Sequence, residues 1–346
     1  MAPTALALQP LSDAVTLRCA RTARCSPART ALCSPARRRS SPFAYQAARD
    51  SATNPPTHVT GRALKGEMHQ LTYRLAIRAF RLLFALLGLR IKVRGEEHLP
   101  ASGPAIVACN HIGFLDFAFV GLAADRRGRL VRFMAKQSTF DNPLSGPPMR
   151  AMRHIPVDRS CGAPAARQAR DELRRGELVG IFPEATISRA WTLKPFMRGA
   201  ATLAVREGVP MIPVAVWGGH RVLTVDGRWS LRRGKAITIL IGEPIVVDPD
   251  AGDATSDAGA AAANGAATDA GVAAANARLR QGMQDLLDRA QLDYPDRPRD
   301  PADRWWLPRH LGGSAPTPRQ AAELDAAALL RADHPVVRTQ TVSGKP

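Results

Sequence analysis

A histidine and an aspartate stand five positions apart in the stretch NHIGFLD, residues 110–116. This stretch directly follows the apolar run PAIVAC, which is typical of a buried strand. A histidine, with an unperturbed pKa of ~6.5, can accept a proton from a weak nucleophile, and a nearby carboxylate can fix its tautomer. The pattern therefore predicts either a base with its orienting carboxylate, His111 and Asp116, or a polar turn in which Asp116 caps a helix.

Two further polar residues follow later apolar runs in the same way. Arg159 comes after HIPVD, and Glu184 follows GIFP. Ligands gather at the carboxyl ends of strands in α/β sheets, so we expect a base, a cation and an acid to converge there. Structural alternatives exist for both: Glu184 as a charge at a helix N-terminus, and Asp158–Arg159 as a surface pair of small energetic weight.

Other common chemistries find no support in the sequence. It contains no G-x-S-x-G, G-x-G-x-x-G, Walker A or H-E-x-x-H motif. The five cysteines form no CxxC pair and are odd in number, which indicates neither a disulfide framework nor a zinc site. The polar residues at the strand ends are therefore the best candidates for a functional site.

The elements that position these residues follow from an alternation of apolar runs and helical stretches over residues 91–249. It predicts an α/β domain with a mostly parallel sheet flanked by helices. Strands are expected at Ala105–Cys109, Val131–Ala135, His154–Val157, Leu178–Phe182, Met211–Val216 and Ile237–Ile241. Helices are expected at Leu115–Ala124, Ala165–Arg175 and Gly199–Glu207.

An amphipathic helix is predicted over residues 68–90. Arg74, Arg78 and Arg81 recur at spacings of four and three and so share one face, beside a broad apolar remainder. The longest uncharged run has eight residues, far short of the ~20 that span a bilayer. The pattern is typical of a helix in a membrane interface with arginines toward anionic headgroups; a helix that covers the core is the alternative.

The remaining segments differ in composition. Residues 1–67 carry no secretory signal and are predicted to be a disordered arm or the result of a misassigned start, with Met68 as the true first residue. Residues 250–276, rich in Ala, Gly and Asp, are predicted to be a linker. Residues 277–346 form an extension with helices at Ala277–Leu292 and near Arg319–Asp333, separated by a segment containing Pro and Trp.

The charge balance favours polyanionic partners. Forty-eight Lys and Arg against 30 Asp and Glu give a formal net charge of +18, which suits nucleic acid, an anionic membrane or phosphorylated substrates. However, residues 1–67 hold ten Lys/Arg and three Asp/Glu and so contribute +7 of this charge. Because no nucleic-acid motif accompanies it, nucleic acid is not expected as a partner.

Four stretches together resemble the ordered blocks of the glycerolipid acyltransferases, the superfamily of the 1-acylglycerol-3-phosphate and related lysophospholipid acyltransferases. They are GPAIVACNHIGFLD, IPVDRS, GIFPEATIS and GVPMIPVAV, in the order of the family, within residues ~90–250. The resemblance implies the fold of that family and transfer of an acyl group to a glycerolipid hydroxyl. The implied donor is acyl-CoA or acyl carrier protein, with no metal or other cofactor.

The resemblance also implies roles for single residues. His111 and Asp116 match the catalytic pair of the family. The residues expected to bind substrate lie in or near the later blocks: Arg159, Glu184, Thr186, Lys194 and Arg198. Backbone N–H groups near Ile112–Gly113 or Pro213–Val214 are candidate donors to a tetrahedral oxyanion.

One block departs from the family pattern. Where the family commonly has G-T-R after the glutamate, this chain has Ala185-Thr186-Ile187. The missing glycine removes conformational freedom and the missing arginine removes a phosphate contact, which Arg189 could partly replace. Position 187 is therefore expected to decide the acceptor.

The expected acceptor is lysophosphatidic acid, with another lysophospholipid or a glycolipid hydroxyl as alternatives. The expected partners are these lipids, the acyl thioester, an anionic membrane surface and, as one candidate donor, acyl carrier protein. A peripheral protein on the cytoplasmic face of the cell membrane is expected. A non-catalytic lipid- or membrane-binding protein on the same fold is the alternative function.

Overall fold

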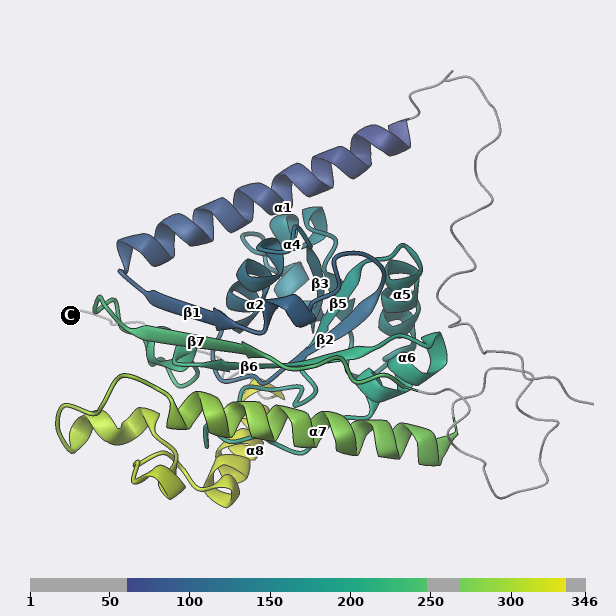
Figure 1. Cartoon of the computed structure of the whole chain (residues 1–346). Helices are drawn as coiled ribbons and strands as arrows, with labels where there is room; N and C mark the ends of the chain where they lie inside the picture. Colours follow the sequence, from purple (N-terminus) through teal and green to yellow (C-terminus); the bar gives the residue numbers. More distant parts are fainter. Residues whose placement is uncertain (1–60, 248–267, 334–346) are drawn as a thin grey trace, which may run out of the picture. The chain divides into compact units, whose positions relative to one another are not determined.

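The computed structural model describes residues 61–247 and 268–333, and Figure 1 shows the arrangement of their helices and strands. The arm predicted over residues 1–67 lies outside the described residues except for its last seven. The first part of the predicted linker and the last 13 residues of the extension also lie outside them.

One seven-stranded sheet forms the centre of the fold, in the order β1-β7-β6-β2-β5-β3-β4. Neighbouring strands are parallel except β6 and β7, which are antiparallel. The strands are β1 (Arg90–Arg94), β2 (Ala105–Cys109), β3 (Val131–Lys136), β4 (Ile155–Val157), β5 (Leu178–Ile181), β6 (Met211–Trp217) and β7 (Ala236–Ile241). This confirms the predicted mostly parallel sheet, and six strands begin and end within one residue of the expected positions.

The strand β1 was not expected, because the helix was predicted to continue to residue 90. Its sequence, R-I-K-V-R, alternates between exposed basic and half-buried apolar residues, which is the period of a strand at a sheet edge. The preceding helix ends because Gly88, at a φ of +58°, adopts the left-handed conformation common after a helix C-terminus.

Helices cover both faces of the sheet (Figure 1). On one face, α1 (Gly61–Leu86) and α2 (Asp116–Asp125) pack with side chains such as Val107 and Ile212. On the other face lie α5 (Ala163–Arg174), α6 (Gly199–Glu207) and α7 (Asp269–Leu292). Two short helices that were not expected, α3 (Gln137–Asp141) and α4 (Gly146–Ala151), connect β3 to β4.

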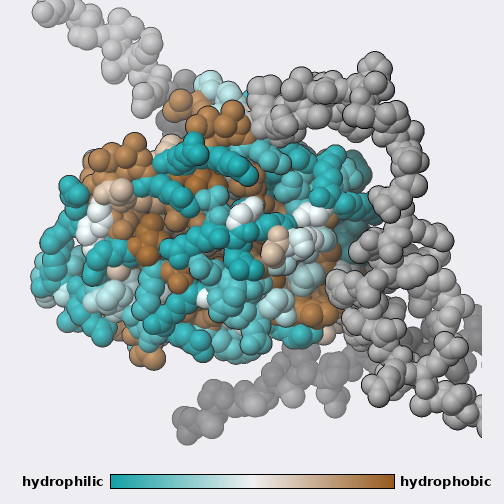
Figure 2. Space-filling view, turned by 45° about the horizontal axis from the view of Figure 1, so that its top comes forward, coloured by the Kyte–Doolittle hydropathy of each residue, from teal (hydrophilic) through white to brown (hydrophobic). Residues whose placement is uncertain are grey.

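The helix α1 begins seven residues before Met68 and ends at Leu86, so the predicted bounds were wrong at both ends. One face packs on the core through buried residues such as Tyr73 and Phe84. A second face carries the exposed arginines, and a third carries a stripe of exposed leucines: Leu71, Leu75, Leu82 and Leu86. In Figure 2, which brings the side of α1 forward, hydrophobic residues gather along the upper part of the molecule.

The structure thus assigns α1 a core-covering face and leaves a separate apolar stripe in solvent. Among the described residues, no helix combines the length and the hydrophobicity that crossing a membrane requires.

The helix α7 begins at Asp269, inside the segment predicted to be a linker. The Thr268 side chain caps its first turn by accepting a hydrogen bond from the Gly271 N–H at 3.1 Å. The linker prediction was wrong for residues 269–276, because alanine-rich sequence has high helix propensity and the larger Val272 is buried in the core.

The end of the chain also packs into this core. Trp306 is 1% exposed, and its carbonyl accepts a hydrogen bond from His220 Nε2 at 2.9 Å. The guanidinium of Arg221 lies 4.3 Å from the centre of its ring. The last described helix, α8 (Pro318–Asp333), follows it.

Replacing Trp306 with alanine should therefore destabilise the whole domain. We expect the Trp306→Ala variant to lose about 3–5 kcal/mol of the free energy of unfolding, because a fully buried aromatic side chain leaves a cavity. Urea unfolding would measure the change. The matched control is Trp229→Ala, at an exposed site, which should change it by less than about 1 kcal/mol. Equal effects of the two substitutions would contradict the packing role of Trp306.

Candidate active site

His111 and Asp116 form a pair at the carboxyl end of β2. The Nδ1 atom of His111 lies 3.1 Å from Oδ2 of Asp116, whose side chain is fully buried. The same oxygen accepts hydrogen bonds from the N–H groups of Ile112 and Gly113 at 2.7 and 2.8 Å. Asp116 therefore caps the loop that precedes α2 rather than the first turn of α2, and the same oxygen orients the histidine.

The arrangement fixes the tautomer of His111. A carboxylate can only accept, so Nδ1 carries the proton and Nε2 carries a lone pair. The ring stacks on Phe182 at a centroid distance of 4.3 Å, and its side chain is 21% exposed. Within the described residues no hydrogen bond to Nε2 is formed, so Nε2 is available as a base.

Three residues that sequence reasoning missed hold this loop in place. The Asn110 side chain donates to the Val216 carbonyl and accepts from the Val216 N–H, at 3.0 and 2.7 Å. The Ser188 N–H donates to the His111 carbonyl at 2.7 Å, and the Thr224 hydroxyl donates to the Ile112 carbonyl at 2.7 Å. Only Asn110 had a signal in the sequence, as a polar residue that ends an apolar run.

Glu184 connects the histidine loop to a second loop. Its Oε1 accepts from the His111 N–H at 2.9 Å, and its Oε2 accepts from the Lys194 N–H at 2.8 Å. Burial raises the pKa of Glu184 to about 8, although both N–H bonds and the Lys194 charge oppose this shift. With both oxygens bonded and the side chain buried, Glu184 acts here by positioning the two loops.

At positions 185–187, where the sequence differs from the family pattern, the structure shows an alanine in the left-handed conformation and a buried isoleucine. Ala185 has a φ of +60°, a conformation that the family's glycine adopts without strain. Its carbonyl accepts a hydrogen bond from Arg159 at 2.7 Å. Ile187 is buried in the protein interior. That position 187 decides the acceptor stays a prediction.

Two cations next to this turn are paired with carboxylates, one of which belongs to the C-terminal helix. Lys194 Nζ donates to the Thr186 hydroxyl at 2.5 Å and to Asp325 of α8. Arg189 pairs with the same Asp325 and, through two bonds of 2.9 and 2.8 Å, with Asp226. In the described part of the chain no carboxylate pairs with Arg159.

Other expected site residues are engaged elsewhere. Arg198 donates to the carboxylate and carbonyl of Asp269, at 2.9 and 3.1 Å, and thereby joins the starts of α6 and α7. The N–H groups of Ile112 and Gly113 already bind Asp116. Proline has no N–H, and Val214 lies inside β6, paired with β2 and β7. The N–H groups that we expected to bind an oxyanion are thus occupied or missing.

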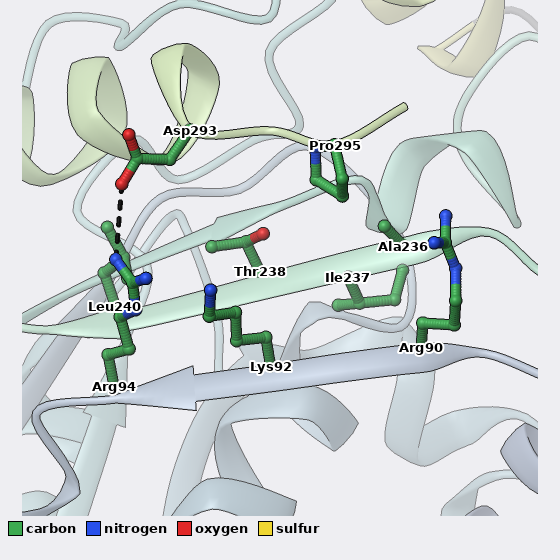
Figure 3. Close-up of a pocket in the computed structure, with 9 residues that line it drawn as sticks. All are labelled: Arg90, Lys92, Arg94, Ala236, Ile237, Thr238, Leu240, Asp293 and Pro295. Carbon is green, nitrogen blue, oxygen red and sulfur yellow. Dashed lines mark hydrogen bonds and ion pairs between the residues drawn. The ribbon is translucent and has the colours of Figure 1, made fainter. Parts of the chain in front are cut away.

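A cavity of ≈ 170 Å³ lies at the far edge of the sheet, between β1, β7 and the end of α7 (Figure 3). Arg94 pairs with Asp293 at 3.2 Å, and Arg90 pairs with Asp296. None of the residues that line it belongs to the site around His111.

Over residues 61–247 and 268–333, no group of three His, Cys, Asp or Glu side chains could hold a metal ion.

The raised pKa of Glu184 predicts a pH dependence of stability. In the folded protein the carboxyl stays protonated up to about pH 8, whereas in the unfolded chain it ionises near ~4.3. Between these values the unfolded chain binds fewer protons, so the contribution of Glu184 to the free energy of unfolding falls as pH rises. Urea unfolding from pH 5 to 8 should show a less negative slope for Glu184→Gln than for wild type. Equal slopes would contradict the raised pKa.

Comparison with known proteins identifies the family to which the sequence is similar. The family described as Acyltransferase matches residues 90–217, from β1 to the end of β6. The chain is 31% identical over 174 residues to the 1-acyl-sn-glycerol-3-phosphate acyltransferase of Bacillus subtilis, a match covering 50% of this chain and 82% of that protein.

Two eukaryotic proteins with the same activity in their names are also similar. A chloroplastic protein of Arabidopsis thaliana is 29% identical over 161 residues, which cover 45% of this chain and 44% of that one. The human alpha protein is 33% identical over 135 residues, which cover 38% and 47%. The chain therefore spans less than half the length of these two relatives.

A solved structure supports the fold. The crystal structure of the 1-acyl-sn-glycerophosphate (LPA) acyltransferase PlsC from Thermotoga maritima superposes with a TM-score of 0.51 at 21% identity, covering 69% of this chain and 86% of that chain. At 21% identity this similarity shows the fold alone. The family is shown by the Bacillus protein, which is 31% identical to this chain over 82% of its own length. The chain thus belongs to the family of the 1-acyl-sn-glycerol-3-phosphate acyltransferases and is an acyltransferase.

Proposed function

We propose that this enzyme moves a fatty acyl group from an acyl thioester to the free hydroxyl of 1-acylglycerol-3-phosphate or a related lysophospholipid. The observation that carries the proposal is the His111–Asp116 pair, in which a buried carboxylate fixes the ring and leaves Nε2 open. The names of the Bacillus, Arabidopsis and human relatives support this acceptor. The donor is acyl-CoA or acyl carrier protein.

The geometry suits direct transfer. Nε2 of His111 takes the proton of the acceptor hydroxyl while its oxygen attacks the thioester carbonyl carbon. Asp116 stabilises the imidazolium that forms, through the bond to Nδ1. When the tetrahedral intermediate collapses, the C–S bond breaks and the departing sulfur takes the proton from Nε2. A thioester is already activated, so no acyl-enzyme is required.

The cations beside the Glu184 turn are suited to the acceptor headgroup. Arg159 is exposed and pairs with no described carboxylate, so it can offer a bidentate fork to a phosphate. Lys194 and Arg189 are compensated by Asp325 and Asp226. Because two of the three cations are already neutralised, a lysophospholipid with a singly charged phosphodiester is the second candidate acceptor.

The exposed stripe on α1 supports a membrane location. Four leucines in solvent beside three exposed arginines suit the interface of an anionic bilayer, with the leucines among the acyl chains. These residues support a peripheral location at a membrane, where the lipid acceptor is dissolved, and we propose the cytoplasmic face of the cell membrane.

Removing the base should abolish transfer. We expect His111→Ala to lower kcat by about 10²–10⁴-fold, the usual contribution of a positioned general base. Thiol release from acyl-CoA, with and without 1-acylglycerol-3-phosphate, measures it, and thermal unfolding checks the fold. The control His310→Ala, at an exposed site, should stay active. A folded and active His111→Ala variant would remove the catalytic assignment; vesicle binding by wild type without thiol release would support a non-catalytic lipid-binding protein.

Removing the carboxylate of Asp325, which leaves Arg189 paired with Asp226 alone, should strengthen acceptor binding. In Asp325→Asn, Lys194 and Arg189 lose a carboxylate that competes with the phosphate. We expect the KM for 1-acylglycerol-3-phosphate to fall by about tenfold, or ~1.4 kcal/mol, with kcat little changed. The control Glu323→Gln removes an exposed carboxylate of α8 whose one ion pair among the described residues is with Arg319. If both variants keep the wild-type KM, these cations do not bind the acceptor.

A further inference from the structure

A short segment between β6 and β7 presents two large apolar side chains to solvent. This segment, the Trp229 loop, comprises residues 228–233 with the sequence RWSLRR. Trp229 is 66% exposed and Leu231 is 62% exposed. Backbone bonds fix the loop: Thr224 N–H donates to the Arg228 carbonyl and Ser230 N–H to the Val222 carbonyl, both at 2.9 Å. The exposure is therefore a property of the folded backbone.

The charged residues of the loop itself have one sign. Residues 227–242 contain no Asp or Glu, and Arg228, Arg232 and Arg233 are exposed. Arg228 lies over the Trp305 ring at 4.9 Å, and neither Arg232 nor Arg233 has an ion pair within the described residues. Tryptophan is enriched at the level of lipid headgroups, and each arginine near an anionic surface adds to the attraction.

The loop continues the exposed surface of α1. The Gly234 N–H donates to the Leu87 carbonyl at 3.2 Å, and the Arg90 N–H donates to the Lys235 carbonyl at 2.9 Å. These bonds join the end of the loop to the residues that follow α1. The last turns of α1 carry the exposed Leu82 and Leu86, so the loop is attached to the end of the helix where these leucines lie.

The residues before the loop are bonded to the catalytic loop. The Phe114 N–H donates to the Leu223 carbonyl at 3.2 Å, and Leu223 forms a bridge with Trp229. Phe114, three residues after His111, is itself 50% exposed. The Trp229 loop is thus bonded both to the end of α1 and, through Leu223, to the loop that carries His111.

We propose that the Trp229 loop is a second membrane-contact element, and that its occupant is the surface of an anionic phospholipid bilayer. Together with α1 it holds the catalytic loop against the bilayer, so that an acceptor can reach His111 with its acyl chain still in the lipid. Two apolar side chains on a narrow loop suit insertion between headgroups, whereas a stable protein interface buries about 800 Å² per partner. The inference rests on the proposed function in that α1 faces the same membrane.

Vesicle sedimentation with the full chain tests the proposal. The vesicles contain phosphatidylcholine alone or phosphatidylcholine with phosphatidylglycerol. We expect Trp229→Ser/Leu231→Ser and Arg232→Gln/Arg233→Gln each to weaken binding to the anionic vesicles about tenfold or more, with unchanged thermal unfolding. Matched controls on the helices α5, α6 and α7, across the sheet from α1, are Leu292→Ser and Arg167→Gln/Arg206→Gln, all at exposed sites; they should bind as wild type. Folded loop variants that bind as wild type would overturn the proposal.

Fluorescence provides a second readout. Of the five tryptophans, Trp229 is the exposed one; the others are buried or partly buried: Trp191, Trp217, Trp305 and Trp306. Brominated lipid in the vesicles should quench the wild-type emission, and Trp229→Phe should remove most of the quenched fraction. Equal quenching in both proteins would place Trp229 outside the bilayer.

The experiment separates this inference from the proposed function. Binding is measured without substrate, so failure of acyl transfer leaves the test of the loop intact. Active loop variants with wild-type vesicle binding would overturn the loop assignment alone. If those variants lose transfer only from acyl carrier protein, the loop is a protein-docking surface and the membrane proposal fails.

Discussion

The active-site geometry depends on one buried carboxylate. Asp116 has no exposed surface, so its charge must be compensated inside the protein, and three donors meet at its Oδ2 atom. Two are the N–H groups of Ile112 and Gly113, which fix the loop backbone; the third is His111 Nδ1–H, which fixes the ring. Backbone and side chain are thus set by the same oxygen. Asp116 is also the first residue of α2, where the helix dipole favours a negative charge.

The order of the strands places the Glu184 turn next to the loop that contains Asp116. The strands β2 and β5 are parallel neighbours, so the loops that follow them lie together. Glu184 then bonds the His111 N–H on one side and the Lys194 N–H on the other. Parallel pairing and two buried carboxyl groups therefore place His111 and the cationic turn side by side.

Local sequence patterns predicted those parts of the fold that are determined by residues close together in the sequence. Unbroken apolar runs marked β2 and the helical period marked α6, both with the observed bounds. The pairing of His111 with Asp116 was also predictable, because it joins residues five positions apart. In contrast, β1 was hidden by an adjoining helix, and the bond from Lys194 to Asp325 joins residues 131 positions apart. Such a contact is created by the packing of α8 and leaves no periodic signal.

The C-terminal residues change how the altered block at positions 185–187 is understood. In sequence, the loss of an arginine at Ile187 suggested a weakened phosphate site, whereas in the structure Arg189 and Lys194 supply two cations next to the same turn. Asp325 pairs with both of them, and it lies beyond the residues 90–217 that match the family. Burial of Trp306 anchors the segment that leads to this helix. The free positive charge next to this turn thus depends on the extension as well as on the block itself, because it is set in part by whether Asp325 stays in place.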